Sequence, residues 1–248
     1  MSRTGSIRSE QIHFANGRVA LAFFPGPAAA AQTIIDRLAL PSPRGLVVLN
    51  GGTTRLEPAM QQRLTATLQD GLARAVAEEG LMAVNGGTDA GVFQLFGQGR
   101  ARWGDRSPSV GVAVADLVSW PGQAGGEAPL EPHQSHFVLG AGKHWGAETS
   151  TMYALVATWS QQCPSVAVFA GGGEITIREM QMNVAQSRPL VLLAGSGRAT
   201  DAVLDARAGK PVEDARLTEI AERGQISAFD LAAHPATLAV LIRQTLLL

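Results

Sequence analysis

The chain has 248 residues, of which 46% are hydrophobic and 17% are charged, and its formal net charge is −1. This balance allows a sizeable buried core and excludes a disordered chain, and the absence of a basic excess argues against a nucleic-acid partner. The single cysteine excludes an internal disulfide bond. The apolar stretches are too short to span a bilayer, and no signal peptide is expected over residues 1–10. We therefore predict a cytoplasmic protein without a membrane partner.

The first predicted element is a β-hairpin. Two apolar segments, 11–15 and 18–24, flank the dipeptide Asn16-Gly17. Asn-Gly between two such segments is typical of a tight hairpin turn. An alanine-rich helix is expected next, over residues 28–39.

A proline-rich stretch at 41–43 indicates a linker. We therefore divide the chain into an N-terminal hairpin and helix extension, 1–43, and a main domain, 44–248. From residue 44 onward, short apolar runs alternate with helical patterns, which is typical of buried parallel strands in an α/β fold. Strands are predicted at 45–49, 81–85, 109–114, 136–139, 165–170 and 189–194. Helices are predicted at 58–79, 90–100, 146–162, 175–187, 199–207 and 235–247.

Four predicted strands end on a glycine cluster that a predicted helix follows. The clusters are Gly51-Gly52-Thr53, Gly86-Gly87-Thr88, Gly171-Gly172-Gly173 and Gly195-Ser196-Gly197. A helix N-terminus carries unpaired N–H groups and partial positive charge, and glycine lets a phosphate approach the backbone closely. Because the carboxyl ends of parallel strands share one edge, the clusters predict an anion-binding edge on a mostly parallel sheet.

Each cluster also has a simpler interpretation. The stretch at 85–92 can cup a phosphate or can be a tight turn in which Thr88 or Asp89 caps the helix. It matches neither a dinucleotide-binding G-x-G-x-x-G nor a phosphate-binding P-loop. Three glycines at 171–173 are costly in entropy and favour ligand approach over a bare turn. Arg198 can grip a phosphate or form a surface ion pair.

Three histidines, His133, His136 and His144, lie close together in the sequence. No carboxylate set with metal-ligand spacing accompanies them, so we expect no metal site. Ser135 and His136 are instead candidates for hydrogen bonds to a ligand. A long Gly/Pro-rich loop at 121–132 is predicted to lie at the surface, where it can close over a ligand.

Six short motifs occur in the order seen in the SLOG superfamily. They are Gly51-Gly52, the run 86–92, Ser135-His136-Phe137, Gly146-Ala147-Glu148, Gly171-Gly172, and Gly195-Ser196-Gly197-Arg198 with Asp201. The chain most resembles the prokaryotic LSDAT branch, which is similar to the N-terminal domain of melastatin-type TRP channels. The resemblance implies a Rossmann-like three-layer sandwich with a mostly parallel central sheet. It also implies binding of a nucleotide-derived ligand, such as ADP-ribose or a related NAD metabolite, with no resident cofactor.

Combining the motifs with the glycine clusters gives the candidate ligand-binding set. Phosphates are expected over the turns at 51–53, 86–88 and 171–173, with Ser196 and Arg198 as side-chain clamps. The full set is Gly51, Gly52, Thr53, Gly86, Gly87, Thr88, Gly91, Ser135, His136, Gly171, Gly172, Gly173, Glu174, Thr176, Gly195, Ser196, Gly197 and Arg198.

A second function stays open. Another SLOG branch, the phosphoribohydrolases, cleaves the N-glycosidic bond of nucleotides and carries P-G-G-x-G-T-x-x-E. With Gly171-Gly172 as the paired glycines, Arg178 stands where the catalytic Glu belongs, and a shift of one residue brings Glu179 there. Glu179 and Glu148 are therefore the candidate catalytic residues of this alternative. A third interpretation is an interaction module with a vestigial pocket, and a homo-oligomer remains an option.

Overall fold

The computed structural model describes residues 7–52, 58–104 and 106–247. In this part of the chain, nine strands form one sheet in the order β1-β2-β8-β5-β4-β3-β9-β10-β11. Only the β1–β2 pair is antiparallel, and every other neighbouring pair in this sheet is parallel. The strands are β1 (Arg8–His13), β2 (Val19–Phe24), β3 (Leu46–Gly51), β4 (Met82–Asn85), β5 (Ser109–Val114), β8 (His136–Gly140), β9 (Ser165–Ala170), β10 (Leu190–Ala194) and β11 (Ile226–Asp230).

Helices follow most of the parallel strands. They are α1 (Ala31–Leu38), α2 (Pro58–Ala66), α3 (Arg74–Glu79), α4 (Gly91–Trp103), α5 (Thr149–Trp159), α6 (Glu174–Ala185), α7 (Arg198–Arg207), α8 (Ala215–Arg223) and α9 (Ala236–Leu246). A π-helical segment, η1 (Thr67–Ala73), joins α2 to α3, so the single helix predicted at 58–79 contains a widened turn. The long connection before β8 holds a 3₁₀ turn, η2 (Ala115–Leu117), and a short pair of strands, β6 (Val118–Ser119) and β7 (Ala128–Pro129).

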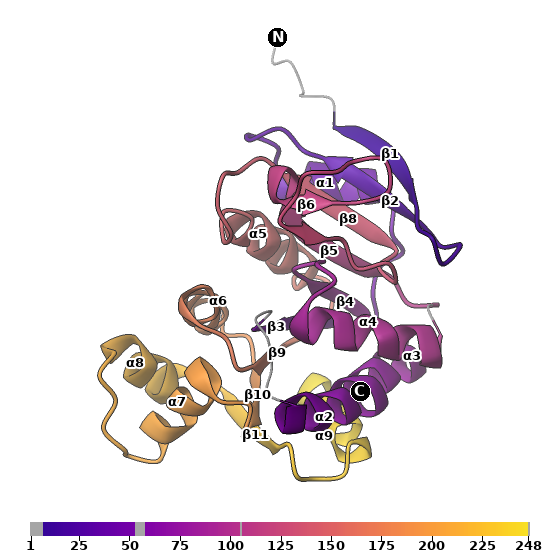
Figure 1. Cartoon of the computed structure of the whole chain (residues 1–248). Helices are drawn as coiled ribbons and strands as arrows, with labels where there is room; N and C mark the ends of the chain where they lie inside the picture. Colours follow the sequence, from indigo (N-terminus) through magenta and orange to yellow (C-terminus); the bar gives the residue numbers. More distant parts are fainter. Residues whose placement is uncertain (1–6, 53–57, 105, 248) are drawn as a thin grey trace.

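The alternation of side chains along buried strands produces three layers. Leu46 and Val48 of β3 belong to a core cluster that includes side chains of α1, α5, α6, α7 and α8. Val47 and Leu49 belong to a second cluster that includes side chains of α2, η1, α3, α4 and α9. All four of these side chains are fully buried. Figure 1 shows the strands between these two groups of helices. The predicted Rossmann-like three-layer sandwich with a mostly parallel sheet is therefore confirmed.

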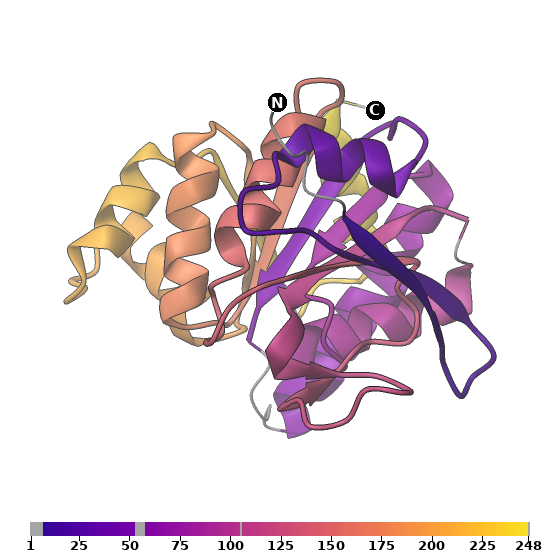
Figure 2. The ribbon, with the colours of Figure 1, turned by 90° about the horizontal axis from the view of Figure 1, so that it is seen from above.

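The N-terminal hairpin extends the same sheet. Its loop has three residues, because the amide of Phe14 donates to the carbonyl of Arg18 at 2.9 Å and Gly17 adopts a φ of +81°. The loop therefore contains Ala15 as well as Asn16 and Gly17, and the two strands are shorter at the turn than the predicted two-residue loop would make them. Since β2 pairs with β8, the hairpin is continuous with the sheet at one end of the molecule, opposite α8 (Figure 2). The division at residue 43 stays a prediction.

The chain order of the strands creates a crevice at the centre of the sheet. After β3 the chain builds β4, β5 and β8 on one side, and it then crosses back to build β9, β10 and β11 on the other. The connections after β3 and β9 therefore leave in opposite directions. In open α/β sheets, ligands bind at such a reversal, outside the carboxyl ends of the strands.

Candidate functional site

A cavity of about 340 Å³ lies at this reversal of strand order. Its described walls come from the carboxyl ends of β3, β4 and β5, the start of α4, the β6–β7 loop, the region before and within α5, and the first turns of α6. The lining residues are Gly51, Gly86, Thr88, Ala90, Phe93, Val112, Glu127, Ala128, Trp145, Glu148, Met152, Ile175, Thr176 and Glu179. Six of the predicted site residues are among them: Gly51, Gly86, Thr88, Glu148, Thr176 and Glu179.

The N-terminus of α6 forms one wall. Ile175 and Thr176 line the cavity from its first turn. In the described part of the chain, no side chain caps this helix, and the amides of residues 174–176 find no backbone acceptor. An uncapped N-terminus carries hydrogen-bond donors and partial positive charge, so this wall is suited to an anionic group.

The helix α7 holds the turn that precedes α6. The amide and the hydroxyl of Thr200 donate to the carbonyl of Gly171 at 3.2 and 2.8 Å, and the amide of Ala199 donates to the carbonyl of Gly172 at 3.3 Å. The donors at the start of α7 are therefore used within the protein. They fix both carbonyl groups of the turn on the α7 side.

The predicted phosphate turn at residues 195–198 has internal partners as well. Asp201 accepts from the amides of Gly195 and Gly197, both at 2.8 Å, and the Ser196 hydroxyl accepts from the amide of Gly171 at 2.8 Å. A Cβ added at Gly173 would lie 3.3 Å from the guanidinium of Arg198, so this side chain reaches the 171–173 turn. None of the residues at 195–198 lines the cavity. Residues 195–198 support the 171–173 turn, which leads into the cavity wall at α6. Their contact with a ligand stays a prediction.

The turns after β3 and β4 approach the cavity directly. Gly51 has a φ of +155°, and a Cβ there would collide with the carbonyl of Ala170, so the close packing of β3 on β9 requires glycine. Gly52 donates to the same carbonyl at 3.1 Å, and Gly87 donates to the Asn85 side chain at 2.8 Å. Thr53 lies outside the described residues. Gly91 begins α4 without lining the cavity.

Ser135 and His136 lie at the opposite edge of the sheet. They stand at the start of β8, where the Ser135 hydroxyl donates to the carbonyl of Ser109 at 2.9 Å. Ser109 is itself the first residue of β5. Because the cavity sits at the carboxyl ends of the strands, these two residues do not share it. Glu174 also faces away: its carboxylate pairs with Arg216 of α8 at 2.7 and 2.8 Å, which lowers its pKa to about 2.

Both candidate catalytic carboxyl groups meet in the cavity. Glu179 lies in the second turn of α6 and is only 9% exposed, and Glu148 immediately precedes α5. Burial, and then the nearby charge of Glu148, raise the pKa of Glu179 to about 8. Burial also raises the pKa of Glu148, although a hydrogen bond from the amide of Gly146 at 2.9 Å opposes this shift. Glu148 and Glu179 both line the cavity, which lies at the reversal of strand order.

The predicted loop at 121–132 forms part of the cavity wall. Glu127 and Ala128 line it, and the Trp145 indole donates to the Glu127 carboxylate at 2.8 Å. The amide of Glu131 donates to the carbonyl of Gly87 at 2.9 Å, which ties the loop to the turn after β4. Sequence reasoning predicted the loop but missed Glu127 and Phe93 as lining residues. Only the loop's length and its position between two strands pointed toward Glu127.

A buried polar network beneath the cavity was also missed. The Tyr153 hydroxyl donates to the Asn50 side chain at 3.0 Å and accepts from the Asn183 amide at 2.8 Å. Asn183 in turn donates to the carbonyl of Glu179 and accepts from the buried Arg188 guanidinium, at 2.8 and 2.7 Å. Tyr153 is the single tyrosine of the chain, and that was the only signal in the sequence. The network joins the end of β3 to the helix that carries Glu179.

Comparison with known protein families identifies the family of this chain. A family model described as SLOG in TRPM, prokaryote, matches residues 44–240. The chain belongs to this family. A search of curated proteins finds no match.

The family assignment agrees with the position of the cavity. The match begins at residue 44, just before β3, and ends within α9, so every lining residue falls inside it. Membership in the SLOG family is consistent with a role in binding or processing a nucleotide-related ligand.

Among the described residues of this SLOG chain, no cluster of three or more His, Cys, Asp or Glu side chains is arranged to hold a metal ion. No described helix combines the length and the apolar character needed to cross a bilayer.

Proposed function

We propose that the chain binds a nucleotide-derived ligand, such as ADP-ribose or a related NAD metabolite, in the cavity at the strand reversal. The observation that carries this proposal is the uncapped N-terminus of α6, which opens onto a cavity of about 340 Å³. A phosphate group at the first turn of α6 would accept from backbone amides that lack other partners. The apolar wall formed by Phe93, Met152 and Ile175 offers space for a base.

Calorimetric titration with ADP-ribose, NAD, AMP and cyclic ADP-ribose tests the proposal. Thr176→Val removes a hydroxyl from the first turn of α6 at nearly constant volume. We expect it to weaken binding of a phosphate-bearing ligand by about 1.5–3 kcal/mol, the range for hydrogen bonds to charged groups.

Thr158→Val is the matched control. This exposed hydroxyl on α5 donates to its own helix at Ala154, at 2.8 Å, and does not line the cavity. We expect its affinities to equal those of the wild type. Unchanged affinity in Thr176→Val would contradict phosphate binding at α6, and an absence of binding for every ligand at millimolar concentration would contradict the proposed function.

A second candidate, hydrolysis of an N-glycosidic bond, is favoured by the two carboxyl groups of the cavity. Near neutral pH a raised pKa keeps Glu179 protonated, as a general acid requires. In this reaction Glu179 gives its proton to the departing base nitrogen while the bond from that nitrogen to C1′ breaks. Glu148 accepts a proton from the water whose oxygen bonds to C1′.

Chromatography for released base and ribose product tests this candidate. We expect Glu179→Gln to retain ligand binding but to lose turnover, because glutamine keeps the shape of the side chain and cannot donate an acidic proton. Turnover that is unchanged in Glu179→Gln and in Glu148→Gln would exclude these residues as catalysts.

A further inference from the structure

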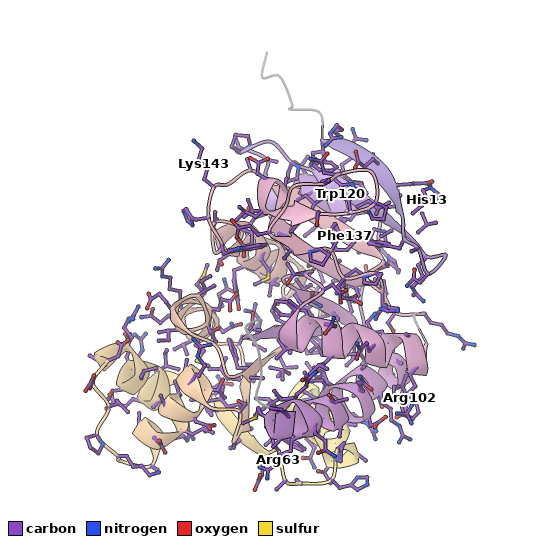
Figure 3. All side chains as sticks on the ribbon, viewed as in Figure 1. His13, Arg63, Arg102, Trp120, Phe137 and Lys143 are labelled. Atoms are coloured by element: carbon purple, nitrogen blue, oxygen red, sulfur yellow. The ribbon has the colours of Figure 1, made fainter. Side chains whose placement is uncertain are left out.

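The described lining of the cavity has an unusual charge balance. Among the described residues, three carboxyl groups line it, those of Glu127, Glu148 and Glu179, and no lysine, arginine or histidine does. The whole chain is nearly balanced, with 20 basic and 21 acidic residues. The acidic character therefore belongs to the described lining of the cavity. Figure 3 shows Arg63, Arg102 and Lys143 on the outside of the molecule, pointing away from the strands.

Glu179 has no partner of its own in the described part of the chain. Its carboxyl group accepts no hydrogen bond and pairs with no cation there, although the side chain is only 9% exposed. The charge of Glu148 acts on it, and that interaction is repulsive. A buried carboxyl group without a partner is costly unless another group neutralises it. A positively charged group of a ligand can reach Glu179 through the open side of the cavity.

Two aromatic side chains line the same space. Phe93 comes from α4, and Trp145 comes from the connection between β8 and α5. The hydrogen bond from the Trp145 indole to Glu127 at 2.8 Å orients this ring at the cavity wall. Aromatic faces attract cations, and they also stack on flat heterocycles.

One helix presents the two opposite electrostatic environments. Thr176 and Glu179 are three residues apart on α6, so they lie on the same face of the helix. The helix N-terminus at Thr176 favours an anion, whereas the carboxyl group at Glu179 favours a cation. A ligand that spans both positions would carry a negative group at one end and a positive group at the other.

We propose that the preferred ligand is a nucleotide whose ribose carries a cationic nitrogen heterocycle, such as a pyridinium ring, placed between the carboxyl groups and the aromatic wall. This inference rests on the proposed function, because it assumes that the phosphate of the same ligand lies at α6. It narrows the ligand class from NAD metabolites in general to those with a positively charged base. The positive ring would face the carboxyl groups of Glu148 and Glu179 and would offset the repulsion between them.

Three probes separate charge from shape. Oxidised NAD carries the pyridinium ring, reduced NAD carries a ring of nearly the same size without the charge, and ADP-ribose lacks the ring. Titrations are made at pH 8.5, above the pKa of about 8 of Glu179. We expect oxidised NAD to bind about tenfold more tightly than reduced NAD, which corresponds to about 1.4 kcal/mol.

Isosteric variants assign this preference to the carboxyl groups. Glu179→Gln and Glu148→Gln should bring the ratio of the two affinities close to one. Glu219→Gln should leave the ratio unchanged, because this residue lies on α8, where it is exposed and paired with Arg223 at 2.5 Å.

The possible results distinguish the two proposals. Equal affinities for the three probes in the wild type, or a preference that survives in both cavity variants, would overturn the charged-base proposal and leave nucleotide binding intact. Equal weakening of all three probes by Glu179→Gln would overturn it in favour of hydrogen bonds to ribose hydroxyls. If none of the probes binds, the proposed function itself fails.

Discussion

At the scale of single residues, Glu179 is the most consequential side chain of the molecule. It is buried on α6, faces a second carboxyl group, and has a pKa raised to about 8. Such a group holds its proton more tightly in the folded chain than in the unfolded chain, where its pKa is near 4.5. Its ionisation therefore opposes folding.

This shift predicts a pH-dependent stability. The stabilising contribution of protonated Glu179 is complete below about pH 4.5 and is lost as the pH rises through 8. We expect the free energy of unfolding to fall between pH 5 and pH 9 by a contribution on the order of a few kcal/mol from this residue. Urea denaturation at both pH values measures it.

Glu179→Gln is the control for that measurement, because glutamine does not titrate. The variant should lose less stability than the wild type over the same interval, and the remaining loss would include the contribution of Glu148, whose pKa is also raised. An identical loss in the two proteins would show that Glu179 does not titrate as the geometry implies.

At the scale of elements, the cavity depends on how β3, α5 and α6 are joined. Tyr153 of α5 is fully buried and bonds to Asn50 at the end of β3 and to Asn183 on α6. Removal of this hydroxyl leaves the side-chain oxygen of Asn50 without its hydrogen-bond donor, while Asn183 keeps its hydrogen bonds to the Glu179 carbonyl and to Arg188. The tyrosine thus fixes the distance between the two sides of the cavity.

Tyr153→Phe tests this role. The ring stays in place, so we expect a loss of about 1–3 kcal/mol in the free energy of unfolding, the cost of leaving a buried polar group unsatisfied. Equilibrium urea unfolding at pH 7 measures it, with Thr158→Val expected to change stability by about 0.5 kcal/mol or less as an exposed substitution. Equal stability of Tyr153→Phe and the wild type would contradict the structural role of the network.

The elements differ in how well the sequence predicts them. Buried central strands such as β5 (Ser109–Val114) and β9 (Ser165–Ala170) have the predicted bounds, because a continuous apolar run leaves few alternatives. The edge strand β11 (Ile226–Asp230) was missed, since it is short and only half buried, and its pattern is set by the neighbouring β10. The amphipathic helix α8 before it was missed with it.

At the scale of the whole molecule, the sequence predicted which turns carry glycine but not which way each turn faces. Residues 171–173 and 195–197 have similar patterns, yet the second turn has its amides bound by Asp201. That difference comes from Asp201 in the first turn of α7, whereas Glu174 in the first turn of α6 pairs with Arg216 of α8. Glu148 and Glu179 were candidates from their motifs, and only the crossing of the chain from β8 to β9 shows that they share a cavity.

The anchoring of the Gly171–Gly172 carbonyl groups by α7 has one more consequence. The peptide planes of the turn that leads into α6 are oriented before any ligand arrives, so their ordering entropy is lost during folding and not during binding. Affinity at α6 is thereby coupled to the docking of a neighbouring helix that the ligand never touches. A substitution that loosened α7 would weaken recognition from a distance, by letting those planes rotate.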